Sequence, residues 1–154
     1  MKKEKCLRLR IIRPVFEEVV VSEETAKYFD GKSISNSRDI YKLFRYLSRE
    51  TKEHFIAIHL DTKNRIICID RISTGSLGDS IVHPREVFKS VLLSSAASIA
   101  VVHNHPSGTP DPSKDDINIT KRLKEAGELL GIEVLDHIII GNGCYISLIE
   151  KGYL

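Results

Sequence analysis

The chain has 154 residues, of which 42% are hydrophobic and 29% are charged, and its formal net charge at pH 7 is +2. These values are typical of a single globular domain, and the small charge does not indicate a nucleic-acid-binding protein, because such proteins usually carry a clustered basic face. No segment has the length of a membrane span, and no apolar stretch follows the N-terminal lysines as in a secretory signal. We therefore expect a cytoplasmic protein without a membrane partner.

The chain contains three cysteines, Cys6, Cys68 and Cys144, which lie far apart. Their number is odd and no CxxC pair occurs, so the sequence suggests neither a disulfide framework nor a cysteine zinc site. A reducing compartment agrees with this pattern. Cys68 and Cys144 stand in apolar runs and are expected in the core, whereas Cys6 is a candidate for an exposed position.

The first 34 residues are predicted to form a separate N-terminal strand or arm. The run MKKEKCLRLR alternates basic with apolar residues, which is typical of an edge strand or arm; a basic DNA-binding arm is the less favoured alternative. FEEVVVS, residues 16–22, is predicted to be a strand, and DGKS, residues 30–33, a turn.

Residues 35–154 are predicted to form the main domain. SNSRDIYKLFRYLSRE, residues 35–50, predicts an amphipathic helix behind three capping candidates, because four apolar residues recur at helical spacing. The capping candidates are Ser35, Asn36 and Ser37, and the apolar residues are Ile40, Leu43, Phe44 and Leu47. HFIAIHLD, residues 54–61, and RIICIDRIS, residues 65–73, predict a hairpin around the polar turn TKN.

After the glycine-containing connection TGSLGDS, Pro84 is predicted to open a helix that runs to residue 96. SIAVV, residues 98–102, predicts a short buried strand. A second helix is predicted from Ser113 to a stop at Gly131. Its apolar stripe consists of Ile119, Leu123, Ala126 and Leu130. Two closing strands, VLDHIII and CYISLI, flank the tight turn GNG. The order of these helices and strands along the chain predicts a mixed α/β domain with helices packed on a central sheet.

The stretch VVHNHPSGTPDPSKDD contains the residues most indicative of chemistry. Side chains alternate along an extended segment, so His103 and His105 point the same way while Asn104 points away. Three prolines and a glycine then turn and stiffen the chain. Ser113 is placed to cap the following helix, and Asp116 falls in its first turn.

Two neutral imidazoles and one carboxylate suit zinc, which prefers tetrahedral nitrogen and oxygen ligands. Three protein ligands leave a fourth position for water, which is the pattern of a catalytic zinc rather than of a closed structural site. We therefore expect one Zn²⁺ per chain, with His103, His105 and Asp116 as its ligands.

A simpler interpretation exists for part of this pattern. Ser113 and Asp116 approximate a capping box, and taken alone such a pair caps a helix more often than it serves chemistry. A lone histidine in a loop is usually solvated. Two histidines on one face, followed by a carboxylate at a helix N-terminus, favour a metal site.

These residues also resemble a known motif. HNHP followed by SKDD is similar to the JAMM (MPN-plus) zinc metalloprotease motif, H-x-H-P followed by S-x-x-D. The longer run HNHPSGTPDPSKDD, with TKRLKEAGELLGIEVLDHIIIG behind it, resembles the RadC branch of that family, and the resemblance covers residues 35–154. It implies a twisted mixed sheet flanked by helices, with a layering like that of cytidine deaminases.

The resemblance implies zinc-dependent hydrolysis of a peptide or isopeptide bond, using a zinc-bound water and a glutamate base. The implied metal ligands are His103, His105 and Asp116. Ser113 would donate a hydrogen bond to the water or the developing oxyanion. The family's general base precedes the first strand of the hairpin, which points to Glu53 here, with Glu86 as the runner-up.

Three further residues receive structural interpretations. Asp136 and His137 match an aspartate–histidine pair of the family and are expected to support the site or the fold rather than to bind the metal. His59 lies within a predicted strand and is expected to be a satisfied residue of the sheet.

Alternative functions come from two other classes. Full-length RadC proteins carry a helical domain of helix-hairpin-helix character where this chain has only its first 34 residues, so the resemblance gives weak support for a nucleic-acid partner. The string His103-Asn104-His105 suggests an HNH endonuclease, but in those enzymes the three residues are spread over a ββα unit. A non-catalytic binding module is the third interpretation. The peptide or protein substrate and the oligomeric state are not predicted.

Overall fold

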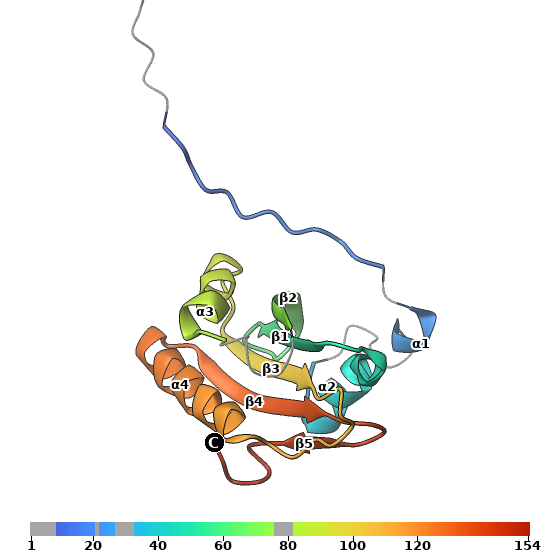
Figure 1. Ribbon diagram of the computed structural model, residues 1–154. Helices are drawn as coiled ribbons and strands as arrows, with labels where there is room; N and C mark the ends of the chain where they lie inside the picture. Colours follow the sequence, from blue (N-terminus) through green and yellow to red (C-terminus); the bar gives the residue numbers. More distant parts are fainter. Residues whose placement is uncertain (1–8, 21, 27–32, 76–81) are drawn as a thin grey trace, which may run out of the picture.

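The computed structural model describes residues 9–20, 22–26, 33–75 and 82–154, and its centre is a five-stranded mixed sheet (Figure 1). The strand order is β2-β1-β3-β4-β5. The strands are β1 (Glu53–Leu60), β2 (Ile66–Gly75), β3 (Ser98–Asn104), β4 (Glu133–Ile140) and β5 (Tyr145–Ser147). Only the β3–β4 pair among these is parallel, because the chain crosses over between them through a helix. The predicted mixed α/β fold is confirmed.

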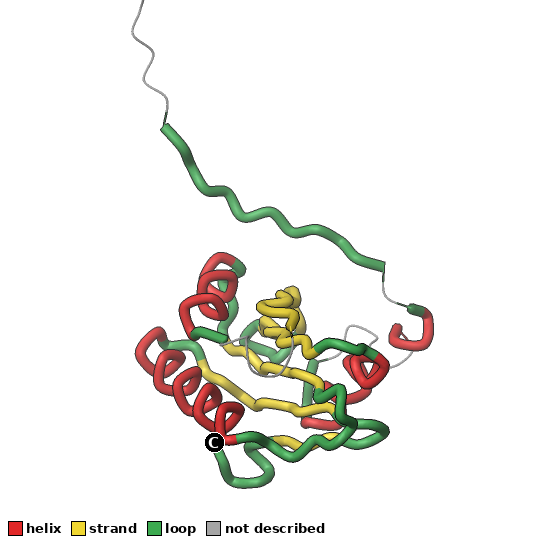
Figure 2. The backbone as a smooth tube through the Cα atoms, viewed as in Figure 1, coloured by secondary structure: helices red, strands yellow, loops and turns green. Residues whose placement is uncertain are grey.

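The helices are α1 (Glu23–Ala26), α2 (Ser37–Phe44), the 3₁₀ helix η1 (Arg45–Arg49), α3 (Pro84–Leu93) and α4 (Lys114–Leu130). All of them except the short α1 cover the two faces of this sheet (Figures 1 and 2). Within the described part of the chain, none of them is both long and apolar enough to span a bilayer.

Alternate residues of the strands supply two separate cores. One core joins α2 and η1 to one face of the sheet, and it contains the predicted apolar residues Ile40, Leu43, Phe44 and Leu47. The other core joins α3 and α4 to the opposite face. Every residue of β3 is buried, because this central strand is covered on both sides.

Local signals set the ends of the helices as expected. The Asn36 side chain accepts the Asp39 N–H at 3.1 Å and caps α2, and Pro84 opens α3. Gly131 ends α4 with a left-handed φ of 71°.

Four structural predictions differ from the structure. The predicted helix over residues 35–50 changes to 3₁₀ geometry at Arg45, and the helix from Pro84 ends at Leu93 rather than at residue 96. Leu130, at the end of the predicted apolar stripe, is 43% exposed and is not among the residues of the core that α4 packs against. β5 is also shorter than predicted and ends at Ser147.

The predicted strand at residues 16–22 is wrong for the described residues. Residues 9–20 are exposed, have no regular secondary structure and extend away from the body (Figure 1). A strand is stabilised by pairing, and no strand partner lies beside this segment in the described part of the chain. Most of the predicted turn at residues 30–33 and Cys6 lie outside the described residues.

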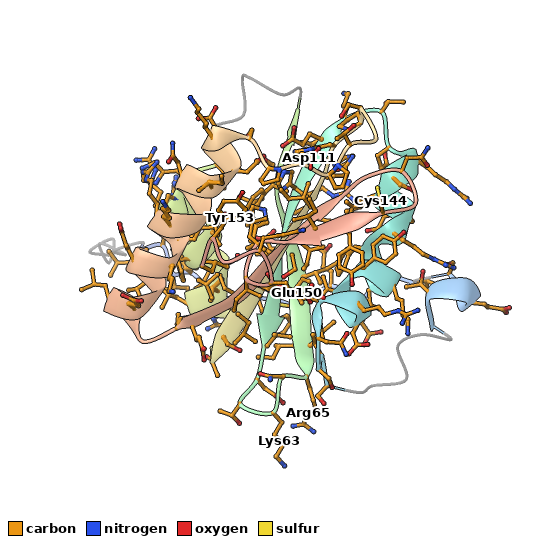
Figure 3. The ribbon with its side chains drawn as sticks, turned by 90° about the horizontal axis from the view of Figure 1, so that it is seen from below. Lys63, Arg65, Asp111, Cys144, Glu150 and Tyr153 are labelled. Atoms are coloured by element: carbon orange, nitrogen blue, oxygen red, sulfur yellow. The ribbon has the colours of Figure 1, made fainter. Side chains whose placement is uncertain are left out.

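The expectation for the two remaining cysteines is also corrected. Cys144 is exposed and Cys68 is only partly buried. Cys144 follows the tight β4–β5 turn at the surface, and Cys68 lies on edge strand β2. Figure 3 shows Cys144 toward one end of the molecule and Lys63 and Arg65, from the β1–β2 turn, at the other.

Candidate metal centre

β3 delivers the two histidines to one side of the sheet. The strand continues two residues beyond the predicted end, so His103 lies inside it and His105 directly follows. His103 is completely buried and His105 is 7% exposed. The N–H of His105 donates to the carbonyl of Ile140 at 2.9 Å, which ties the chain to β4 after β3 has ended. Both rings therefore emerge from a fixed backbone.

The loop after His105 is held by the β4–β5 turn. Gly108 has a φ of 86°, and its carbonyl accepts the N–H of Asn142 at 2.8 Å. A Cβ on Gly141 would lie 2.4 Å from that carbonyl oxygen, so the close approach requires glycine. The predicted stiffness of the loop thus comes from packing as well as from proline.

Asp116 is fixed by the predicted capping box at the start of α4. The Ser113 hydroxyl accepts the Asp116 N–H at 3.1 Å, while Asp116 Oδ2 accepts both the N–H and the hydroxyl proton of Ser113 at 2.7 Å. These bonds occupy Oδ2 and leave Oδ1 to face His103. Capping and a role in a metal site are therefore compatible.

The three side chains converge to the spacing of a metal site. His103 Nε2 lies 3.0 Å from His105 Nε2 and 3.2 Å from Asp116 Oδ1, and His105 Nε2 lies 3.5 Å from Asp116 Oδ2. A tetrahedral ion with bonds of about 2.0–2.1 Å separates its ligand atoms by roughly 3.3–3.4 Å. In the described part of the chain, this is the one group of three such side chains whose ligand atoms all lie within 4.8 Å of one another. The group could hold a metal ion.

The charges in the group favour a cation. Burial raises the pKa of Asp116, but the adjacent His103 and His105 rings outweigh this effect and hold that pKa well below its usual range. The same carboxylate raises the pKa of His105, against the effect of burial. Two imidazoles and an ionised carboxylate thus attract positive charge, which a proton or a metal ion can supply.

Glu53 lies beside this group without belonging to it. Its Oε1 atom is 3.9 Å from His103 Nε2, and its Oε2 atom is buried without a hydrogen-bond partner. Burial raises the pKa of Glu53, and the two nearby histidines offset part of the rise. An unpaired buried acceptor is costly, so Oε2 is available to a hydrogen-bond donor.

Asn104, for which the sequence analysis predicts no role, fixes the backbone on both sides of Glu53. Its Oδ1 accepts the N–H of His54 at 2.8 Å, and its Nδ2 donates to the carbonyl of Lys52 at 3.0 Å. The side chain is completely buried. Side-chain alternation turns Asn104 away from the metal group, and this signal could have identified its structural role. The two hydrogen bonds of Asn104 to the backbone of His54 and Lys52 are called the Asn104 clamp below.

Glu86, the second candidate for the general base, pairs with a lysine of its own helix and not with the metal group. Glu86 is half exposed and accepts a hydrogen bond from Lys89 at 2.7 Å, and Lys89 lowers its pKa. His59 is a satisfied residue of the sheet, as predicted, with Nδ1 2.8 Å from the Ser94 hydroxyl and 3.2 Å from Cys68 Sγ.

Asp136 and His137 support the site from β4. Asp136 accepts the N–H of His137 and the hydroxyl proton of Ser147, both at 2.7 Å. His137 Nε2 lies 2.7 Å from His103 Nδ1, so this ring contacts a member of the group from behind. Complete burial lowers the pKa of His137 well below the usual value.

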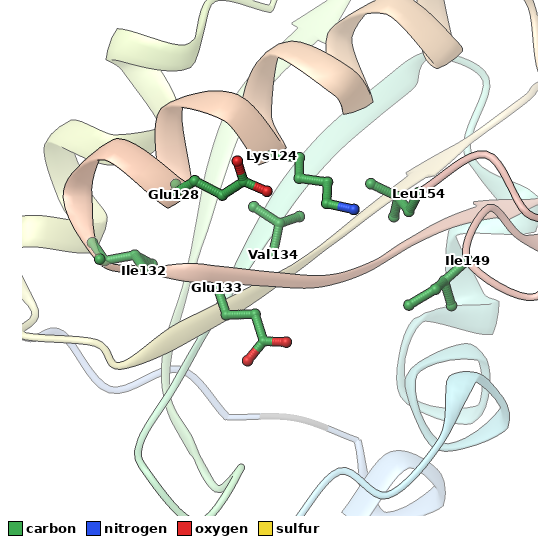
Figure 4. A pocket seen from close by; sticks show the side chains of 9 residues that line it. Lys124, Glu128, Ile132, Glu133, Val134, Ile149 and Leu154 are labelled. Atoms are coloured by element: carbon green, nitrogen blue, oxygen red, sulfur yellow. The ribbon is translucent and has the colours of Figure 1, made fainter.

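A cavity of about 360 Å³ lies at the other end of α4 (Figure 4). Its lining includes Lys124, Glu128, Val134, Ile149 and Leu154. It contains none of the histidines or acidic residues of the metal group, so it is separate from the candidate centre.

The chain is similar to known proteins over most of its length. The family model described as "RadC-like JAB domain" matches residues 34–153. A "UPF0758 protein" of Methanosarcina mazei is 55% identical over 124 residues, which are 80% of this chain and 54% of that protein. One of Caldanaerobacter subterraneus subsp. tengcongensis is 58% identical over 125 residues, 79% of this chain and 52% of that protein. The chain spans about half the length of the curated relatives it matches.

Proposed function

Because the chain belongs to the RadC-like JAB domain family, we propose that it is a zinc-dependent hydrolase of peptide or isopeptide bonds. The observation that carries the proposal is the convergence of His103, His105 and Asp116, with the Glu53 carboxyl held 3.9 Å from His103. A site with three protein ligands and a neighbouring unbound carboxyl is the arrangement of a catalytic rather than a structural metal.

The donor set favours zinc among the common metals. Two imidazole nitrogens and one carboxylate oxygen suit its borderline softness, whereas magnesium and calcium prefer oxygen ligands alone. Oδ1 of Asp116 is the carboxylate oxygen left without a bond from Ser113, so Asp116 would bind through that atom. When bound, zinc would supply a Lewis acid and lower the pKa of a water molecule to about 7.

Glu53 is the proposed general base. Its raised pKa brings the carboxyl closer to neutral pH than that of an exposed glutamate, and its buried Oε2 has no competing donor. The carboxylate would accept a proton from the attacking water and return it to the leaving amine. Asn104 would keep the carboxyl in place by fixing the peptide groups on either side.

Ser113 has two proposed tasks that use the same hydroxyl. The oxygen caps α4, and the proton is directed at Asp116 Oδ2 at 2.7 Å. A hydrogen bond to the reacting oxygen would require this proton to turn away from Asp116. Because Ser113 N–H still holds Oδ2 at 2.7 Å, the carboxylate would stay in place during that rotation.

A trap experiment tests the function. Glu53→Gln keeps the size of the side chain and its hydrogen bonding but removes the base, so this variant should bind zinc normally and retain uncleaved substrate. Cross-linked partners of Glu53→Gln, identified by mass spectrometry, should be cleaved by the wild-type protein and by the matched Glu86→Gln variant. Their full cleavage by Glu53→Gln, or a loss of activity in Glu86→Gln alone, would contradict the assignment.

The alternative classes are outcomes of the same experiment. Metal-dependent nicking of plasmid DNA by the wild-type protein, absent in Glu53→Gln, would replace the peptidase with a nuclease. Partners that remain uncleaved by every variant and stay bound after chelation would replace it with a binding module.

A further inference from the structure

A line of buried polar side chains runs from His103 through β4 to α4. His103 Nδ1 is 2.7 Å from His137 Nε2, His137 Nδ1 is 2.6 Å from the hydroxyl of Thr120, and that hydroxyl is 2.5 Å from the carbonyl oxygen of Asp116. His103, His137 and Thr120 are all completely buried. The line therefore begins at one member of the metal group and ends on the backbone of another.

The chemistry of the last link sets the direction of every bond in this line. A carbonyl oxygen only accepts, so Thr120 donates its single proton to Asp116 and must accept from His137 Nδ1. Neither ring partner of His137 is an acid, so the ring is neutral and its Nε2 carries a lone pair. His103 must then hold a proton on Nδ1, and in the neutral ring this leaves a lone pair on Nε2.

That lone pair faces the metal group. His103 Nε2 is the atom that lies 3.0 Å from His105 Nε2 and 3.2 Å from Asp116 Oδ1. His105 reaches the same state by a different route, because its Nδ1 lies 2.8 Å from the carbonyl of Thr109. A backbone carbonyl fixes the tautomer of His105, whereas side chains fix that of His103.

We propose that Thr120 and His137 are positioning residues that hold the proton of the neutral His103 ring on Nδ1, so that this ring presents Nε2 to a metal ion. The inference rests on the proposed function, because that function supplies the metal site. The hydrogen-bonded line from Thr120 through His137 to His103 is called the relay below. The position of the ring is fixed separately: Phe55 stacks on His103 with centroids 5.8 Å apart and meets His137 edge-on at 5.4 Å.

A pair of substitutions at Thr120 separates the relay from simple packing. Thr120→Val preserves the shape but removes the hydroxyl, so His137 Nδ1 loses its acceptor and the ring can take the other tautomer. Its Nε2–H would then donate to His103 Nδ1 and move the proton of His103 to Nε2. Thr120→Ser keeps the hydroxyl and removes only a methyl group, which disturbs packing but not the relay.

Two measurements on the full chain test the proposal. Zinc affinity, measured by competition with a chromophoric chelator, should fall about 10- to 100-fold in Thr120→Val, the range typical for removal of a group that orients a ligand. Thr120→Ser should remain close to wild type. In metal-free protein, above the pH at which its histidines titrate, ¹H–¹⁵N correlation of the side chains should place the His103 proton on Nδ1 in the wild type and in Thr120→Ser, but not in Thr120→Val.

The outcomes distinguish the relay from the proposed function. Equal zinc affinities of wild type and Thr120→Val, or a wild-type proton on His103 Nε2, would overturn the relay. Loss of zinc affinity in Thr120→Ser to the same extent as in Thr120→Val would also overturn it, in favour of packing alone. If the wild-type protein binds no zinc, the proposed function fails, and the NMR result still decides whether the relay sets the tautomer.

Discussion

Replacement of Ser113 by alanine tests how firmly the start of α4 is held. The change removes two hydrogen bonds: the one that the Ser113 oxygen accepts from the N–H of Asp116 at 3.1 Å, and the one that its hydroxyl donates to Asp116 Oδ2 at 2.7 Å. The hydrogen bond from the N–H of residue 113 to Asp116 Oδ2 remains, because its donor belongs to the backbone. Asn36→Ala is the matched control, because Asn36 caps α2 through a single bond to Asp39.

The expected cost follows from these bonds. Loss of an N-cap side chain costs about 1 kcal/mol. Hydrogen bonds to charged groups contribute roughly 1.5–3 kcal/mol when shielded, but Ser113 is exposed, so water replaces most of the second bond and we expect about 0.5–1 kcal/mol from it. Ser113→Ala should therefore cost about 1.5–2 kcal/mol and Asn36→Ala about 1 kcal/mol. For a chain near this size, each 1 kcal/mol lowers the Tm by about 2–4 °C.

The assay is urea unfolding of the metal-free variants in the presence of a chelator, with thermal unfolding as a check. A cost of Ser113→Ala no larger than that of Asn36→Ala would refute the reasoning, because the bond to Oδ2 would then contribute nothing. Zinc affinity should change little, since Asp116 Oδ1 is untouched. Once a substrate is known, a loss of turnover of about a hundredfold or more would support the second role of Ser113.

Three further predictions concern the surroundings of the site. His103→Ala should bind no zinc yet keep its far-UV circular dichroism, because His103 belongs to neither apolar core; global unfolding would mean that the metal is structural. Burial lowers the pKa of His59, so the folded state resists protonation and stability falls as the pH drops below about 6.5. His59→Gln should flatten that loss in urea unfolding between pH 7 and 5, and an unchanged slope would contradict the pKa argument. Asn104→Ala leaves the His54 N–H and the Lys52 carbonyl without their partner and should cost about 1–3 kcal/mol in the same assay, whereas wild-type stability would exclude the Asn104 clamp.

The shared direction of His103 and His105 could be predicted because it is local. Alternation along an extended chain places them on one side, and the signals for a helix cap place Asp116 in the first turn of the next helix. The structure adds that the strand runs through His103 and that a turn packs on the loop. Both details depend on neighbours that the local pattern does not contain.

The distance of Glu53 from the histidines could not be predicted, because it depends on which strands pair. β1 lies antiparallel to β3 with Phe55 opposite His103, and this register brings the start of β1 to the end of β3. The contact of His137 with His103 likewise depends on the parallel pairing of β3 and β4. A sequence pattern defines the faces of a strand, but it does not name the neighbouring strand.

Two wrong predictions have the same origin. The valine-rich composition of residues 16–22 suggested a strand, but a strand also requires a partner edge. The apolar neighbours of Cys144 suggested burial, but the residue follows a tight turn at the surface. In both cases composition indicates what a segment could bury, and only the tertiary arrangement determines whether it does so.

The most direct test of the metal site is a crystal structure of the zinc-supplemented protein, with anomalous diffraction recorded on both sides of the zinc absorption edge. We expect one zinc per chain, about 2.0–2.2 Å from His103 Nε2, His105 Nε2 and Asp116 Oδ1, with the Glu53 carboxyl outside the coordination sphere. The absence of zinc, its binding by other residues, or a fourth protein ligand that closes the site would contradict a catalytic zinc centre.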